Sequence, residues 1–168
     1  MGKAENLTKK EKIKKYGEVF TPNWLVRDMC DMLERESPEA FRPEKTFLEP
    51  TCGEGVFVCE ILQRKFANCR TEEERRTAVK SVWAMELQAD NVEKTIRAVT
   101  ELCEQNLKLR KEDREIIRSH IIQADAMKVM GMMNELNQME GGGPVFVFTK
   151  TNSTMEEQEE RNGGTGDI

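Results

Sequence analysis

The chain of 168 residues has few of the side chains that build metal sites or covalent crosslinks. His120 is its single histidine, which leaves no His-rich zinc site and one residue at most for a Cys–His nucleophile pair. Five cysteines are present, an odd number without any CxxC pair, which argues against a disulfide framework. We therefore expect no metal site, reduced thiols and a cytoplasmic protein. The cysteines are Cys30, Cys52, Cys59, Cys69 and Cys103.

Long apolar runs are also missing. No stretch of about 18 apolar residues occurs, so we expect no membrane span. No apolar segment follows the lysine-rich residues 1–15, so we do not expect a secretory signal there. The formal net charge is -5, whereas proteins that bind duplex DNA present a basic face to its phosphates. The charge argues against DNA binding by this chain alone, although it leaves room for a local basic patch.

Composition divides the chain into three parts. Residues 1–15 hold six lysines against two glutamates, which is typical of either a basic arm or the solvated start of a helix. Residues 16–150 alternate between apolar and polar positions and are expected to form one cofactor-binding domain. Residues 151–168 are acidic and contain glycine, and we predict a disordered tail because they have almost nothing to bury.

Helical and strand-like segments alternate along the middle part. This pattern predicts an α/β fold with about four mostly parallel strands and helices on both faces of the sheet. Thr21 and Thr71 are predicted N-caps, and Glu74 has the spacing of a capping box with Thr71. The predicted helices cover residues 22–34, 56–66, 71–80, 91–107 and 128–139, and the predicted strands cover residues 46–48, 81–85, 120–124 and 145–148.

Ligands of parallel sheets bind at the carboxyl ends of the strands, so the residues that follow each strand matter most. Gly53 and Gly55 follow the first strand, and such a loop lets the backbone approach a ligand. A tight strand-to-helix turn would have the same pattern. The loop lacks the Gly-Lys-Ser/Thr of a phosphate loop and the third small residue of the dinucleotide fingerprint.

An acidic residue follows each of the next two strands. Glu86 is placed to accept both hydroxyls of a ribose, or else to lie solvated at a helix N-terminus. Asp125 is placed to accept a hydrogen bond from an exocyclic amine such as adenine N6, with Met127 over the ring, or else to serve as an N-cap. Together with the glycine loop, these acids predict a site for an adenosine-containing cofactor.

Two stretches resemble a known family. Residues 16–22 read Tyr-Gly-Glu-Val-Phe-Thr-Pro, and residues 47–57 read Phe-Leu-Glu-Pro-Thr-Cys-Gly-Glu-Gly-Val-Phe. In order and spacing they are similar to the N-terminal part of DNA adenine-N6 methyltransferases of the restriction-modification type. The resemblance runs from about residue 16 to residue 148, and it implies a Rossmann-like fold that binds S-adenosylmethionine.

The resemblance also implies which residues hold the methionine end of this cofactor. Thr21 would hold the carboxylate. Glu49 and the backbone of Thr51, Cys52 and Gly53 would hold the amino group and the rest of the methionine portion.

Four further residues would hold the adenosine. By the resemblance, Glu86 would bind the ribose and Leu87 would pack on the adenine. Asp125 would accept from adenine N6, and Ala126 would lie beside the ring.

The chain departs from the family where catalysis is expected. The family carries Asn/Asp-Pro-Pro-Tyr/Phe after its fourth strand, to hold the target amine and stack on the flipped base. Here residues 149–152 read Thr-Lys-Thr-Asn, so we predict no catalytic residue and no methylation of DNA by this chain alone. The family's target-recognition region is also missing, so DNA would be reached only through a partner.

Three functions follow as alternatives. The chain is a cofactor-binding subunit completed by a second protein, a non-catalytic regulator or scaffold derived from a methyltransferase, or a remnant that folds and binds nothing. The strand predicted at residues 145–148 begins with Val145 and ends with Phe148, and it would form an apolar edge. Such an edge predicts pairing with a second subunit or with a second copy of the chain.

Overall fold

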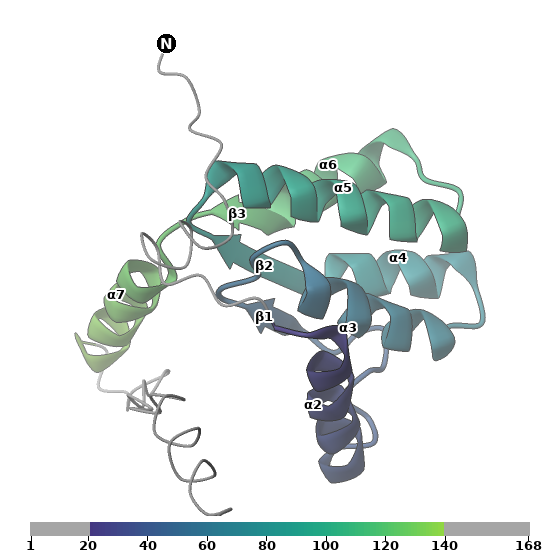
Figure 1. Cartoon of the computed structure of the whole chain (residues 1–168), viewed down its shortest axis with the longest axis horizontal. Coiled ribbons are helices and arrows are strands. Elements are labelled where there is room, and N and C mark those ends of the chain that lie inside the picture. Colours follow the sequence, from purple (N-terminus) through teal and green to yellow (C-terminus); the bar gives the residue numbers. More distant parts are fainter. Residues whose placement is uncertain (1–20, 140–168) are drawn as a thin grey trace, which may run out of the picture. The chain divides into compact units, whose positions relative to one another are not determined.

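The computed structural model describes residues 21–139 (Figure 1). It divides the chain into two compact units, Met1–Val129 and Met130–Ile168, and helix α7 extends from the first into the second. The described elements are, in chain order, α2 (Asn23–Glu36), β1 (Phe47–Glu49), α3 (Val56–Ala67), α4 (Glu72–Lys80), β2 (Val82–Glu86), α5 (Ala89–Asn106), α6 (Lys111–His120), β3 (Ile121–Gln123) and α7 (Ala126–Met139). None of these helices is long and apolar enough to cross a membrane.

The three described strands form one parallel sheet in the order β1-β2-β3. Leu48 is paired with Trp83, and Met85 with Ile122, so the strands end at the same edge of the sheet. The predicted α/β class and the parallel pairing are confirmed by this arrangement. The fourth predicted strand, residues 145–148, lies outside the described residues.

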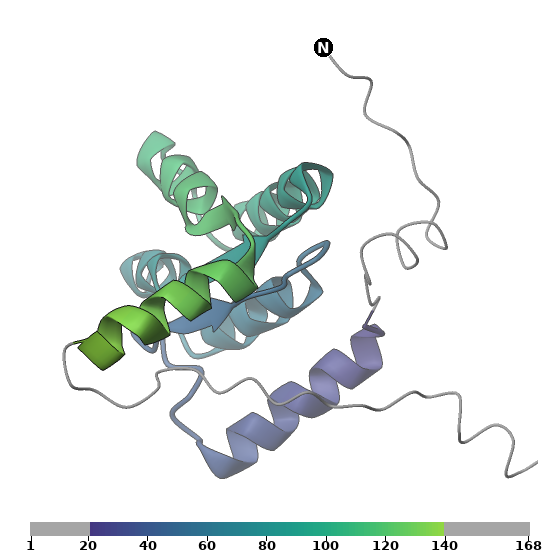
Figure 2. The same cartoon turned by 90° about the vertical axis from the view of Figure 1, so that its left-hand side faces the viewer.

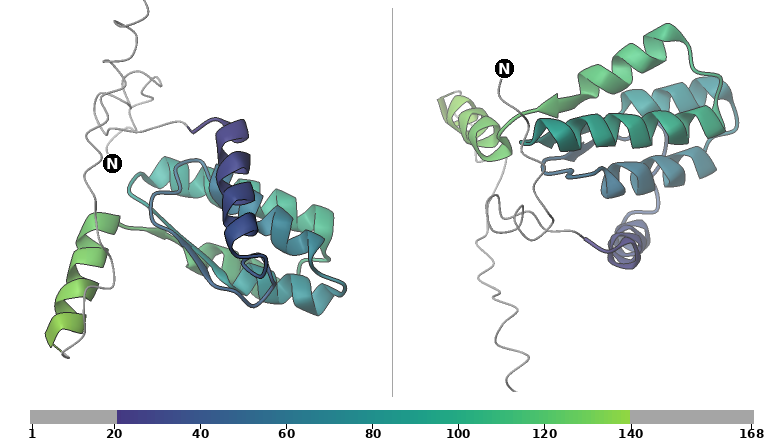
Figure 3. Two further views of the ribbon diagram at one scale, coloured as in Figure 1. Left: turned by 90° about the horizontal axis from the view of Figure 1, so that it is seen from below. Right: turned by 45° about the horizontal axis from the view of Figure 1, so that its top comes forward.

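Helices α3, α4, α5 and α6 cover one face of this sheet. Val82, Ala84 and Ile121 point into a small apolar space that residues from all four helices also line. Helix α3 lies between α2 and α5 (Figures 2 and 3). Among residues 21–129, the helices that pack on the sheet all lie on this face, and helices on the other face stay a prediction. Right-handed crossovers that step from β1 to β2 to β3 in one direction put every connecting helix on the same side.

The opposite face of the sheet is apolar and is left open by these four helices. Side chains on neighbouring residues of a strand alternate between the faces, so Leu48, Trp83 and Ile122 lie on the opposite face. They are 39%, 37% and 41% exposed. Trp83 stacks there on the ring of His120, the last residue of α6. One face of the sheet is therefore buried under helices, and the other has large apolar side chains that are partly exposed.

The buried face of the sheet and the helices that cover it form one continuous apolar core, which includes four of the five cysteines. Phe41 and Cys103 are fully buried, and Leu62 is nearly so. All five cysteines lie among the described residues, and each is a free thiol there. Burial raises the pKa of Cys52 and Cys103 to about 12, so both thiols stay protonated at neutral pH.

Most of the predicted helices begin and end within a few residues of the observed bounds. The capping box of Thr71 and Glu74 is present as predicted. The predicted cap at Thr21 is wrong, because α2 begins one residue later and Pro22 is its N-cap, without a side-chain hydrogen bond. Helix α6 was not predicted, and His120, assigned to a strand, is its last residue.

Candidate functional site

The carboxyl ends of the three strands meet because backbone hydrogen bonds continue past the sheet. The Cys52 N–H donates to the Met85 carbonyl at 2.9 Å, and the Ala124 N–H donates to the Glu86 carbonyl at 2.9 Å. The loops that follow β1 and β3 are thereby tied to the end of β2. The predicted site residues on these loops are brought to one edge of the sheet.

The loop between β1 and α3 depends on two glycines in the left-handed region. Gly53 has φ +53° and Gly55 has φ +86°, values that residues with a Cβ rarely adopt. A Cβ on Gly55 would lie 2.7 Å from Cγ2 of Thr95, whereas one on Gly53 would meet nothing within 4 Å. Gly55 is thus required both by its conformation and by the close approach of α5, and Gly53 by its conformation alone.

Glu86 is buried at the centre of this edge, with 8% of its surface exposed. Its Oε2 accepts a hydrogen bond from the Gly53 N–H at 2.9 Å, and its Oε1 accepts from the Gln88 N–H at 2.8 Å. The alternative of a solvated carboxylate therefore does not hold. A carboxylate has about four acceptor positions, so two more remain for a ligand after these bonds.

Asp125 begins helix α7 and acts as its cap. Its Oδ1 accepts a hydrogen bond from the Lys128 N–H at 3.3 Å, and its Oδ2 lies 3.6 Å from Nζ of Lys128. The capping role considered for this residue is therefore present. Capping occupies one oxygen, and it leaves the half-buried carboxylate with further acceptor positions.

A pocket of about 280 Å³ lies between these two acids. Glu86 and Asp125 supply the carboxylates of its lining, and the exposed Leu87 and Met127 supply apolar cover. Five of the nine residues predicted to bind the cofactor line it, namely Thr51, Glu86, Leu87, Asp125 and Ala126. The remaining lining residues are Pro50, Gln88, Ala124 and Met127.

Three of the other predicted residues lie at the end of β1 or on the loop that follows it. Glu49 accepts from the Thr51 N–H at 3.1 Å and from the Thr51 hydroxyl at 3.5 Å. Burial raises the pKa of Glu49, and these hydrogen bonds oppose the rise. The Cys52 thiol is buried, and both backbone polar groups of Gly53 are engaged within the protein. Thr21, the ninth residue, lines neither this pocket nor the one described next.

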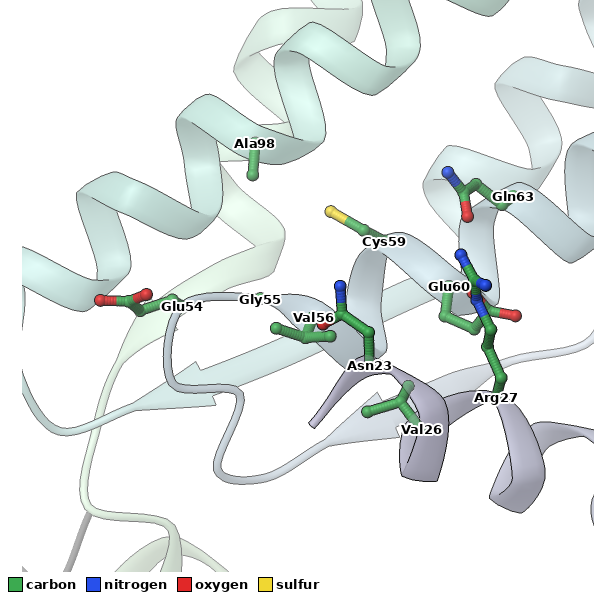
Figure 4. Close-up of a pocket in the computed structure, with 10 residues that line it drawn as sticks. All are labelled: Asn23, Val26, Arg27, Glu54, Gly55, Val56, Cys59, Glu60, Gln63 and Ala98. Carbon is green, nitrogen blue, oxygen red and sulfur yellow. The ribbon is translucent and has the colours of Figure 1, made fainter. Parts of the chain in front are cut away.

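A second pocket of about 280 Å³, which was not predicted from the sequence, lies between α2, α3 and α5 (Figure 4). Its charged groups are paired: Arg27 Nε lies 3.9 Å from Glu60 Oε2, and Glu54 Oε1 lies 2.8 Å from Nζ of Lys94. Burial raises the pKa of Cys59 to about 11, so its thiol is not a ready nucleophile. The lining is formed by Asn23, Val26, Arg27, Glu54, Gly55, Val56, Cys59, Glu60, Gln63 and Ala98.

Comparison with protein-family models, with curated proteins and with solved structures gives no match in any of the three. The resemblance to DNA adenine-N6 methyltransferases therefore stays a prediction. The departure from the family's catalytic motif concerns residues 149–152, which lie outside the described residues, as do the predicted arm (1–15) and tail (151–168).

Proposed function

We propose that the chain is the S-adenosylmethionine-binding part of a DNA adenine-N6 methyltransferase-like protein with a Rossmann-like fold. The observation that carries this proposal is the pocket that Glu86 and Asp125 line together with Thr51. Glu86 ends β2, whereas Thr51 and Asp125 lie just beyond β1 and β3, and the three meet at the carboxyl edge of a parallel sheet. Ligands of open parallel sheets bind at this edge.

The pocket matches the adenosine half of the cofactor in size and chemistry. Its volume of about 280 Å³ is close to the lower end of the range for small-molecule sites. Glu86 would accept the two ribose hydroxyls, and Asp125 would accept a hydrogen bond from adenine N6. Leu87 and Met127 would cover the faces of the ring.

The methionine half would extend toward the loop after β1. Glu49 lies there beside Thr51, and a carboxylate is suited to an ammonium group. Methyl transfer also requires the acceptor to be held in line with the methyl group. Because residues 149–152 lack the motif that would do this, we expect a partner subunit to supply it and the DNA contacts.

A non-catalytic regulator or scaffold derived from a methyltransferase is the second candidate. It is favoured by the open apolar face of the sheet, where Leu48, Trp83 and Ile122 are each more than a third exposed. Exposed apolar groups that gather on one face are typical of protein interaction sites. The two candidates differ in whether the cofactor pocket is used.

Calorimetric titration with S-adenosylmethionine and S-adenosylhomocysteine tests the proposal. Asp125→Asn is the informative variant, because asparagine caps a helix about as well as aspartate. Its carbonyl oxygen would keep the bond to Lys128, which turns the amide nitrogen toward the ligand. A donor would then face adenine N6, so binding should weaken by about 1–3 kcal/mol.

Asp90→Asn is the matched control. Asp90 lies in the first turn of α5, outside the pocket lining, and its substitution removes the same charge. We expect wild-type affinity in this variant. A folded wild-type chain that binds neither compound would refute the cofactor site, and the regulator or scaffold role would then be favoured.

A further inference from the structure

Thr95 is a fully buried polar residue of α5 that lies against the glycine loop. Its hydroxyl donates a hydrogen bond to the Gly53 carbonyl at 2.9 Å. Its methyl group occupies the space that a Cβ on Gly55 would need. The residue therefore fixes the loop both by a directed bond and by its shape, and it does so from a helix some forty positions away in the sequence.

Two other threonines of α4 and α5 donate their hydroxyl hydrogen bonds within their own helix. Thr77 donates to the Glu73 carbonyl at 2.9 Å, and Thr100 donates to the Ile96 carbonyl at 2.7 Å. Both bonds go back one turn within the same helix, which is the usual choice of a helical threonine. Thr95 instead directs its hydroxyl out of its own helix and onto the loop.

The bond from Thr95 is the first of a short series that ends at the pocket. The Gly53 carbonyl accepts from Thr95, and the Gly53 N–H donates to Oε2 of Glu86 at 2.9 Å. The second oxygen of Glu86 accepts from the Gln88 N–H. With both polar groups of Gly53 held, its peptide units cannot rotate without breaking a partly buried hydrogen bond, and the Glu86 carboxylate keeps one orientation.

We propose that Thr95 is a positioning residue of the cofactor site: through Gly53 it sets the orientation in which Glu86 accepts the ribose hydroxyls. Thr95 does not line the pocket, so it acts on the site through Gly53. This inference rests on the proposed function, since it assigns a ribose to Glu86. It adds a residue of α5 that no sequence motif indicated.

Thr95→Val and Thr95→Ser separate the hydroxyl from the shape. Valine keeps the branched shape and loses the donor, and serine keeps the donor and loses the methyl group. In Thr95→Val we expect the Kd for S-adenosylhomocysteine to rise about tenfold, the effect of one lost hydrogen bond. In Thr95→Ser we expect a Kd within about threefold of wild type.

The Gly53 amide provides a readout that does not depend on binding. In ¹H–¹⁵N spectra of the free protein, its proton should shift and exchange faster with solvent in Thr95→Val, because its bond to Glu86 loosens. Thr95→Ser should restore the wild-type signal. Thr100→Val, which removes a hydroxyl from the same helix, should change neither the Gly53 signal nor the Kd.

Four results are decisive. A wild-type Kd in Thr95→Val, with wild-type binding intact, would overturn the role of Thr95 and leave the proposed function standing. Absence of binding by the wild-type chain would overturn the proposed function, and the inference with it. An unchanged Gly53 signal in Thr95→Val would also overturn the inference. If Thr95→Val does not fold, Thr95→Ala is compared with Thr95→Ser, and equal affinities of that pair would contradict the role of the hydroxyl.

Discussion

Gly53 and Gly55 share a left-handed backbone conformation but differ in their surroundings. Gly55 is the N-cap of α3 and is buried against Thr95, whereas a side chain on Gly53 would meet nothing within 4 Å. The loop therefore contains one position where glycine is required by φ alone and one where it is also required by packing. The pair makes it possible to measure these two effects separately.

Gly55→Ala should destabilise the protein more than Gly53→Ala. A left-handed φ costs a residue with a Cβ about 1–2 kcal/mol, and this cost applies to both variants. At Gly55 the new methyl would also collide with the Thr95 side chain, which adds about 1–3 kcal/mol. Urea unfolding measures both free energies of unfolding, and equal losses would contradict the close approach of α5.

Single residues were predictable where the signal was local. Glu86 and Asp125 could be assigned to the site because each directly follows an apolar strand. The bonds that hold Glu86 could not be predicted, because Gly53 is 33 positions away and Thr95 is 42 positions from Gly53. Such contacts depend on how α5 packs on the loop, and no spacing in the sequence encodes that.

Among the elements, α4 illustrates a helix whose start is specified locally. The Thr71 hydroxyl accepts from the Glu74 N–H, and the Glu74 carboxylate accepts from the Thr71 N–H. Three glutamates in the first turn add a favourable interaction with the helix dipole. These features lie within four residues, which is why the helix could be predicted with its capping box.

Thr71→Ala should lower the free energy of unfolding by about 1 kcal/mol, the usual cost of losing an N-cap. Thr77→Ala is the control, because Thr77 is exposed on the same helix and its hydroxyl donates to the Glu73 carbonyl one turn back. It should change stability by less than about 0.5 kcal/mol. Urea unfolding checks both values, and a similar loss in the two variants would show that the cap does not stabilise α4.

Helix α6 shows the limit of local signals. Its first turn is highly charged, and no glycine or proline separates it from α5. Asp113 is nonetheless buried, where it pairs with Arg76 of α4 at 3.2 Å and accepts from the Arg110 N–H at 2.8 Å. Contact between α4 and α6 thus supports this helix, and that contact exists only in the folded chain.

In the first unit, Met1–Val129, the alternation of helices and strands along the sequence was enough to predict a parallel α/β sheet. It did not predict which face of the sheet the helices cover. Residues 21–129 put four helices on one face and leave Leu48, Trp83 and Ile122 on the other. The order β1-β2-β3 decides this, and strand order is set by long-range pairing. The predicted strand at residues 145–148 stays a prediction.

The central claim is that one edge of this sheet binds the cofactor, and the two pockets of similar volume allow a direct test. The measurement is a titration of the ¹⁵N-labelled chain with S-adenosylhomocysteine, followed by ¹H–¹⁵N spectra with assigned amides. We predict saturable shifts at residues 51–53, 86–88 and 124–127, with little change at residues 23–27 and 59–63. Shifts confined to the second set, or no shifts in a folded protein, would contradict the claim.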